Sequence, residues 1–352
     1  MTESRPTILV PVDGSPESER AIPVALALAR ERQGSVRVVH VFVPVAGIGG
    51  SAGSGTADAD EDGIGLELQG QLRDEARAYL RSLTDRLAKA GEHGVACDFI
   101  DGRGVRSPFG EAASVTGAIL RHAEKWSATH IVMTTHGRGG PSRAWLGSVA
   151  DGIARESRIP LILVRAGDVP APIADGFTRI LVPLDGSAPA REAIAPALAL
   201  RSRAGARLTL LRVVPPRLEL ARPAPVSRVD SAAVAEESAA AERELAAIAE
   251  QMAAPGVAAD VLVLVDANPA RAILEVADRT RADLIAMSTH GRGGIRRVLL
   301  GSVADKVVRA ARTSVLLVRR VESESGEPGA TTTAGAQRAP AARHLTGPGD
   351  DA

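Results

Sequence analysis

The chain has 352 residues, with 42 Lys or Arg and 42 Asp or Glu, so its formal net charge is zero. This balance argues against a nucleic acid or an anionic membrane as partner, and no apolar run approaches the roughly 20 residues of a membrane helix. The single cysteine, Cys97, excludes an internal disulfide framework, and the N-terminus shows no apolar signal core. We therefore expect a soluble cytoplasmic protein of two domains.

The first part of the chain alternates short apolar runs with amphipathic segments. Strands are predicted at Thr7–Val12, 36–43, 95–100, 130–134 and 160–164. Helices are predicted after Ser15, along 72–87, around 117–125 and from Ser148. Ser15 is expected to cap the first helix, with Pro16 at its first position. Cys97 lies in the third strand, where we expect it to be packed rather than reactive.

The second part repeats this order. Strands are predicted at 179–184, 207–214, 257–265, 283–288 and 314–318, again separated by helices, one of them at 231–252. The sequence ILVPVDGS at 8–15 recurs as ILVPLDGS at 180–187, with the aspartates 172 positions apart. In each copy, five strands alternating with four helices predict a parallel α/β sheet covered on both faces. We expect one domain at 1–167, a linker at 168–176, a second domain at 177–320 and a disordered tail at 321–352.

The two copies differ in length. His136 and His290 are only 154 positions apart, so the first copy is 18 residues longer between its aspartate and its histidine. Part of the excess is the polar, glycine-rich stretch 46–65, which we expect to be a flexible insertion, and the rest lies within 101–115.

A glycine-rich segment follows the fourth strand of each copy. Thirteen of the seventeen residues in THGRGGPSRAWLGSVAD at 135–151 recur in THGRGGIRRVLLGSVAD at 289–305. Such glycines allow close approach of the backbone to a phosphate, and the Gly-Ser that follows opens a helix whose N-terminus favours anions. Arginines of the segment add positive charge: Arg138, Arg143, Arg292 and Arg297.

The aspartate after the first strand of each copy completes a candidate nucleotide site. In open α/β sheets, ligands bind beyond the carboxyl ends of the strands where the strand order reverses. Asp13 and Asp185 have oxygens that can accept hydrogen bonds from ribose hydroxyls or an adenine amino group. Alone, an Asp-Gly-Ser turn or a glycine loop is often only structural, and His136 and His290 are expected to be loop or capping residues. The combination, which occurs twice, favours a ligand site.

These motifs resemble those of the universal stress protein family, in its tandem UspA-like form. The family pattern is Gly, two residues, Gly, nine residues, Gly, then Ser or Thr. Nine residues separate Gly137 from Gly147-Ser148, and nine separate Gly291 from Gly301-Ser302. The PVDGS start and the LILVR and LLVRR ends also match over 5–167 and 177–320. The first glycine of the pattern is replaced by Thr134 and Ser288, which leaves nucleotide affinity open.

The resemblance implies two Rossmann-like (adenine nucleotide alpha hydrolase-like) domains, each with strand order 3-2-1-4-5 and four helices. It places ATP, or AMP or ADP, with or without Mg²⁺, in the crevice between strands 1 and 4. The implied nucleotide-binding residues of the first copy are Pro11, Asp13, Val41, Thr134, Thr135, His136, Gly137, Arg138, Gly139, Gly140, Gly147, Ser148 and Val149. Those of the second copy are Pro183, Asp185, Val213, Ser288, Thr289, His290, Gly291, Arg292, Gly293, Gly294, Gly301, Ser302 and Val303. No catalytic or metal-ligating residue is expected.

The resemblance also implies how the domains associate. The last strands, Leu161–Val164 and 315–318, are expected to pair within the chain as a pseudo-dimer, because such edges need a partner. A homodimer and an unidentified protein partner are compatible with the family.

Three functions remain open at this stage. The first is an adenine-nucleotide-binding regulator or sensor of the stress response. The second is a nucleotide-free scaffold for dimerisation or protein contacts, which Thr134 and Ser288 favour slightly. The third is an ATP-using enzyme, against which stand the absence of a Walker lysine motif and of a paired base and nucleophile, although slow hydrolysis is known among relatives.

Overall fold

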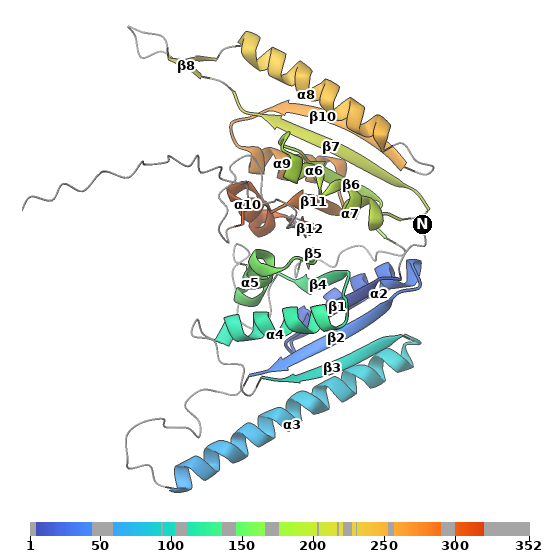
Figure 1. The fold of residues 1–352 in the computed structure, drawn as a ribbon, viewed down its shortest axis with the longest axis vertical. Coiled ribbons are helices and arrows are strands. Elements are labelled where there is room, and N and C mark those ends of the chain that lie inside the picture. The colour runs from blue at the N-terminus through green and yellow to red at the C-terminus, as the bar shows by residue number, and fades with distance from the viewer. Residues whose placement is uncertain are drawn as a thin grey trace, which may run out of the picture. The chain divides into compact units, whose positions relative to one another are not determined.

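The computed structural model describes residues 5–43, 59–92, 94–102, 111–135, 146–165, 176–202, 204–216, 218–220, 227–229, 231–252, 257–289 and 300–319. These residues form two α/β halves joined through one sheet (Figure 1). The predicted tail at 321–352 and most of the predicted linker lie outside the described residues.

The first half contains the five predicted strands. They are β1 (Thr7–Val12), β2 (Ser35–Phe42), β3 (Val95–Asp101), β4 (His130–Thr134) and β5 (Leu161–Val164). The helices are α1 (Pro16–Glu19), α2 (Ala21–Glu31), α3 (Ala59–Lys89), α4 (Glu111–Lys125) and α5 (Ser148–Glu156).

The second half repeats this arrangement. Its main strands are β6 (Arg179–Pro183), β7 (Ala206–Val214), β10 (Val257–Val265), β11 (Leu284–Ser288) and β12 (Ser314–Val318). Its helices are α6 (Ala188–Arg191), α7 (Ile194–Ala199), α8 (Ser231–Gln251), α9 (Pro269–Thr280) and α10 (Ser302–Ala310). A short hairpin of β8 (Leu218–Leu220) and β9 (Ser227–Val229) follows β7 and was not predicted.

The ten main strands form one sheet in the order β10-β7-β6-β11-β12-β5-β4-β1-β2-β3. Each half therefore has the expected order 3-2-1-4-5, and the main strands within a half all pair in parallel. The halves meet at an antiparallel pairing of β5 with β12, in which Leu163, Ile162 and Leu161 face Val315, Leu316 and Leu317. The predicted pairing of the last strands within one chain is confirmed.

Both faces of the sheet are covered, as continuous apolar strands require. Alternation along β1 sends Ile8 and Val10 to the face covered by α2, and Leu9 to the face covered by α4 and α5. The same alternation divides the other strands. Two large aliphatic clusters result, and each includes residues of both halves. The join between β5 and β12 therefore lies inside continuous core on both faces.

The helix predicted after the first strand is broken in each half. Helix α1 ends at Glu19, and Pro23 lacks the N–H that would bond the carbonyl of that residue four positions back. In the second half α6 and α7 are likewise separate helices, although Glu192 and Ala193 between them keep αR dihedral angles, and Pro196 has no N–H to donate to the carbonyl of Glu192. The described part of each half thus has five helices where four were predicted.

Two boundaries were predicted wrongly. Helix α3 begins at Ala59, so residues 59–65 of the predicted flexible insertion are helical. Once a helix is nucleated, each added residue gains one backbone hydrogen bond, which favours its extension. Residues 46–58 lie outside the described part of the chain. Helix α4 likewise begins at Glu111, six residues before the predicted start.

The cysteine is packed, as predicted. Cys97 lies in β3 and contacts the core on the face covered by α2 and α3. Burial raises the pKa of its thiol, which disfavours the reactive thiolate.

The join between the halves can be tested by truncating one buried side chain. Ile162 is fully buried, pairs with Val132 on one side and faces Leu316 on the other. We expect Ile162→Ala to lower the free energy of unfolding by about 2–5 kcal/mol, because it leaves a cavity in the shared core. Urea unfolding followed by circular dichroism measures the loss. Leu68→Ala, at a residue 39% exposed on α3, is the control and should change stability by less than about 0.5 kcal/mol. Equal losses in the two variants would contradict a core that is continuous across β5.

A partly buried histidine makes stability dependent on pH. His130 opens β4, and burial together with the nearby positive charge of Arg32 lowers its pKa from 6.5 to about 4. Between these values the unfolded chain binds more protons than the folded chain. The contribution of His130 to stability is therefore complete above about pH 6.5 and is lost as the pH falls toward 4.

We expect His130→Gln to make the free energy of unfolding depend less on pH in this range. The wild type should lose up to about 3 kcal/mol more than the variant between pH 7 and pH 4. Urea unfolding at several pH values gives both profiles. Parallel profiles would show that His130 titrates in the folded protein as it does in the unfolded chain.

Candidate functional site

The ends of three neighbouring strands bring the predicted residues of each copy into one row. Val12 of β1 pairs with His40 of β2, so the next residues, Asp13 and Val41, lie opposite each other. On the other side, β1 pairs with β4 only at Ile8–His130 and Leu9–Ile131, so Asp13 and Thr135, which follow the carboxyl ends of these strands, lie beyond the paired part. Val41 and Asp13 lie on adjacent strands, which are about 4.8 Å apart, and Thr135 follows the strand on the other side of β1.

The row lies on the sheet face covered by α4 and α5. Val41 packs against the core on this face, and Pro11 pairs with Val39 of the same core. The second half places Val213, Asp185 and Thr289 at the ends of the equivalent strands, with Pro183 beside them, and β6 likewise pairs with β11 only at Ile180–Leu284 and Leu181–Ile285. Both Thr135 and Thr289 are 3% exposed.

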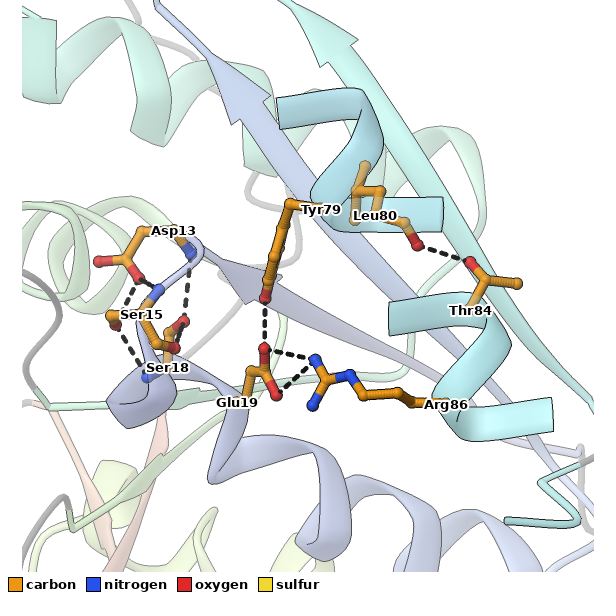
Figure 2. A network of polar contacts seen from close by, with 8 residues as sticks. All are labelled: Asp13, Ser15, Ser18, Glu19, Tyr79, Leu80, Thr84 and Arg86. Atoms are coloured by element: carbon orange, nitrogen blue, oxygen red, sulfur yellow. Dashed lines mark hydrogen bonds and ion pairs between the residues drawn. The ribbon is translucent and has the colours of Figure 1, made fainter. Parts of the chain in front are cut away.

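A tight turn fixes the carboxylate of each row. Asp13 Oδ1 accepts hydrogen bonds from the backbone N–H of Ser15 at 2.9 Å and from its hydroxyl at 2.6 Å (Figure 2). Asp185 and Ser187 repeat these contacts at 2.9 and 2.6 Å. Ser15 also caps α1, where its hydroxyl oxygen accepts from the N–H of Ser18, so the predicted cap is confirmed.

The second component of each site is a helix N-terminus docked on the fourth strand. The N–H of Gly147 donates to the carbonyl of Thr135 at 2.8 Å, and that of Gly301 donates to Thr289 at 2.9 Å. Helices α5 and α10 begin at the following serines, as predicted, and neither start has a side-chain cap within the described residues. A Cβ at position 301 would lie 3.0 Å from the carbonyl oxygen of Thr289, so this approach favours glycine.

The residues that replace the first motif glycine face away from the row. Thr134 pairs with Val164, and Val164 belongs to the core on the opposite face of the sheet. Ser288 pairs with Val318 in the same way. Both are buried, at 5% and 8% exposure. Their side chains therefore do not occupy the face that carries Asp13 and Asp185.

The remaining predicted residues divide into two groups. Val149 and Val303, in the first turns of α5 and α10, are partly buried and pack against the core beneath the row. The loop residues lie outside the described part of the chain: His136, Gly137, Arg138, Gly139 and Gly140, and His290, Gly291, Arg292, Gly293 and Gly294.

The sequence analysis did not predict a polar side chain that bonds the backbone carbonyl just before the aspartate of each row. His40 Nδ1 lies 3.0 Å from the carbonyl oxygen of Val12, the residue before Asp13. At the equivalent position, Arg212 Nε donates to the carbonyl oxygen of Leu184, before Asp185. The signal was present, since each is the lone polar residue in an otherwise apolar stretch, VVHVF and LLRVV.

A second missed network ties the turn after the first strand to the long helix of the same half. Glu19, at the end of α1, accepts from Tyr79 at 3.0 Å and from Arg86 at 2.8 Å, both on α3 (Figure 2). Burial raises the pKa of Tyr79, and the hydrogen bond to Glu19 raises it further, so the phenol remains a donor.

The second half makes the same connection with the charges reversed. Arg191 of α6 donates to Glu244 of α8 at 2.7 Å, and the buried Arg212 donates to the same carboxylate at 3.0 Å. Burial raises the pKa of Glu244, but the bonds from these two arginines outweigh it, so the pKa is below its ordinary value.

Across the described segments, no group of three or more His, Cys, Asp or Glu side chains is placed to hold a metal ion. None of the described helices is long and apolar enough to cross a membrane.

Comparison with known proteins decides the family. The sequence profile of the universal stress protein family matches residues 5–165 and again 176–319. The chain belongs to this family. Thr134 and Ser288, which stand where the motif quoted above has its first glycine, therefore belong to a universal stress protein.

Individual relatives agree with this assignment. A universal stress protein of Mycobacterium tuberculosis (strain ATCC 25618 / H37Rv) is 31% identical over 198 residues, which are 55% of this chain and 62% of that protein. A universal stress protein of Thermus aquaticus is 37% identical over 144 residues, 41% of this chain and 99% of that protein.

Solved structures show the same fold. A universal stress protein from Archaeoglobus fulgidus DSM 4304 aligns with a TM-score of 0.60 at 19% identity, over 91% of this chain and 100% of its own. A universal stress protein crystallised with cAMP aligns over 41% of this chain and 97% of its own, at 27% identity with a TM-score of 0.31. That likeness is too low to transfer its ligand to this chain.

The turn that holds Asp13 can be tested by removing its hydroxyl. We expect Ser15→Ala to lower the free energy of unfolding by about 1 kcal/mol, because α1 loses its cap and Asp13 a hydrogen-bond donor. Ser187→Ala should cost about as much, since its contacts are the same. Ser148→Ala is the matched control: Ser148 is exposed, and its helix has no side-chain cap. Urea unfolding compares the three, and a loss in Ser148→Ala equal to the others would contradict the assigned role of the cap.

Proposed function

We propose that this universal stress protein is an adenine-nucleotide-binding regulator with one site in each half. The observation that carries the proposal is the juxtaposition of three complementary groups at the same strand ends, twice in one chain. Each site offers an apolar valine for a base, an aspartate fixed by a turn for hydroxyl or amino donors, and a helix N-terminus for phosphate. ATP is the expected ligand, with AMP and ADP as alternatives.

The placement of Thr134 and Ser288 supports this function over a nucleotide-free scaffold. These two residues favoured the scaffold as long as they were taken to line the phosphate site. Their pairing with Val164 and Val318 puts their side chains on the far face of the sheet. The crevice face is then formed by the same residue types in both halves.

A binding role suits these rows better than rapid turnover. The titratable group of the first row is a single aspartate, Asp13, whose Oδ1 already accepts two hydrogen bonds from Ser15. General acid–base catalysis calls for a group free to exchange a proton with the substrate. We therefore propose a sensor that binds its nucleotide and does not consume it quickly.

The proposal can be tested by placing a negative charge at the first residue of α5 and of α10. Ser148 and Ser302 are exposed first residues of α5 and α10. In the double variant Ser148→Glu, Ser302→Glu, we expect ATP to bind at least about tenfold more weakly. One pair of unit charges at 4 Å costs about 1 kcal/mol even in bulk water, and a triphosphate carries several charges. The helices themselves should be unaffected or stabilised, because their N-termini favour acidic side chains.

The measurement has two parts. Denaturation of purified protein followed by chromatography identifies and counts any bound nucleotide, and calorimetry with ATP and Mg²⁺ gives the affinity. The double variant Ser148→Gln, Ser302→Gln has nearly the same size as the glutamate variant without its charge and should bind ATP more tightly than that variant. Wild-type protein that is empty and gives no heat with ATP would leave the scaffold function standing.

A further inference from the structure

An arginine stands directly after the last strand of each half and reaches into the other half. Arg165 follows β5, and its Nη2 donates to the backbone carbonyl of Arg309 at 2.8 Å. Arg319 follows β12, and its Nη1 donates to the backbone carbonyl of Arg155. The two contacts are equivalent, because the halves exchange the same hydrogen bond across the β5–β12 pairing.

Each of these bonds falls on the last turn of a helix. Arg155 is the last residue but one of α5, and Arg309 is the last but one of α10. Carbonyl groups at a helix C-terminus have no partner within the helix, and a positive charge there interacts favourably with the helix dipole. Burial lowers the pKa of Arg165, as expected for a guanidinium drawn from water into this contact.

The side chains of the two helix ends are fixed as well. Arg155 Nε donates to Asp151 at 2.7 Å, and Arg309 bonds Asp305 at 2.8 Å. The bond to Asp151 raises the pKa of Arg155, and Asp305 of the other half raises it further. Asp151 acts in the same way on Arg309. The arginine in the last turn of each helix therefore interacts across the join with the aspartate in the first turn of the other helix.

The opposite ends of the same helices form the proposed nucleotide sites. Helix α5 starts at Gly147-Ser148 against Thr135, and α10 starts at Gly301-Ser302 against Thr289. With nine residues, each helix is about 13 Å long, so one short rigid element joins a site to the neighbouring half.

Each arginine also directly follows a residue that is hydrogen-bonded to the proposed nucleotide site of its own half. The N–H of Thr135 donates to the carbonyl of Val164, the residue before Arg165, at 3.1 Å. The N–H of Thr289 donates to Val318, the residue before Arg319, at 3.0 Å. Arg165 thus lies next to the first site but holds the helix of the second, and Arg319 does the reverse.

We propose that Arg319 is a positioning residue for the nucleotide site of the first half, and Arg165 for that of the second half. This inference rests on the proposed function. Each arginine fixes the C-terminal end of the helix whose N–H groups face the phosphates, so the helix does not have to be ordered when the nucleotide binds. Each site is then complete only when the other half is in place.

Single-site proteins allow the two sites to be measured separately. Ser302→Glu leaves the first site intact, and Ser148→Glu leaves the second. In the Ser302→Glu protein, we expect Arg319→Ala to weaken ATP binding about three- to tenfold and Arg165→Ala to change it less than about twofold. In the Ser148→Glu protein the two arginine variants should exchange these effects. Calorimetry with ATP and Mg²⁺ measures all four combinations.

Two further sets of variants separate positioning from loss of structure. Arg319→Lys and Arg165→Lys keep a donor and a positive charge, and they should recover most of the affinity that alanine loses. Arg158→Ala and Arg312→Ala are the matched controls, since both arginines are exposed and lie shortly before the same last strands. The controls should bind ATP like the parent proteins.

Hydrogen exchange of the nucleotide-free protein tests the positioning without relying on the ligand. Arg319→Ala should speed exchange in the last turn of α5, including the N–H of Ser157, which bonds Ile153 at 2.8 Å. Arg165→Ala should do so in α10, including the N–H of Ala311, which bonds Val307 at 2.7 Å. Each variant should leave the other helix unchanged.

The outcomes are distinct. If Arg165→Ala weakened ATP binding mainly at the first site, or Arg319→Ala mainly at the second, the effect would be local and the crossed assignment would be wrong. Equal weakening at both sites would show a general loss of structure and would also overturn it. If wild-type protein binds no nucleotide, the proposed function fails, while the crossed exchange pattern still decides whether the arginines position the helices. Uniform exchange in both helices of both variants would overturn the positioning role itself.

Discussion

The antiparallel pairing of β5 with β12 is the constraint on which the rest of this universal stress protein depends. Strand 5 would be an open edge in either half alone, and edges of this kind attract other strands. Here the two edges cover each other through fully buried aliphatic residues, and two five-stranded parallel sheets become one sheet of ten. The same pairing brings the ends of α5 and α10 together, which makes the exchange of arginine contacts geometrically available.

Much of this architecture is encoded locally. Runs such as TILVPV and LILV identify buried strands because nearly every position is aliphatic, and Gly-Ser after the glycine-rich segment identifies where α5 and α10 begin. The Asp-Gly-Ser turns could be predicted because the side chains that form them are two residues apart. The strand order came from the resemblance to a family, since no local pattern specifies which strands are neighbours.

What sequence could not show depends on residues brought together by the fold. Glu19 and Tyr79 are 60 residues apart, and Arg165 and Arg309 are 144 apart, so neither contact leaves a local pattern. The face on which Thr134 lies follows from its pairing with Val164 rather than from its identity. The break between α1 and α2 was missed for another reason: the apolar spacing of a single helix continues through it, although Pro23 was visible.

The reversed charges that tie each long helix to its own half have a consequence for how the chain folds. Two similar halves on one chain can exchange equivalent elements and misassemble. If α3 docked on the second half, Arg86 would meet Arg191, and the buried Arg212 would lose the carboxylate of Glu244. If α8 docked on the first half, Glu244 would meet Glu19. Repulsion between like charges, and above all the burial of an unpaired guanidinium, disfavour the exchanged arrangements. The inverted ion pairs therefore favour the docking of each long helix on its own half over docking on the other half.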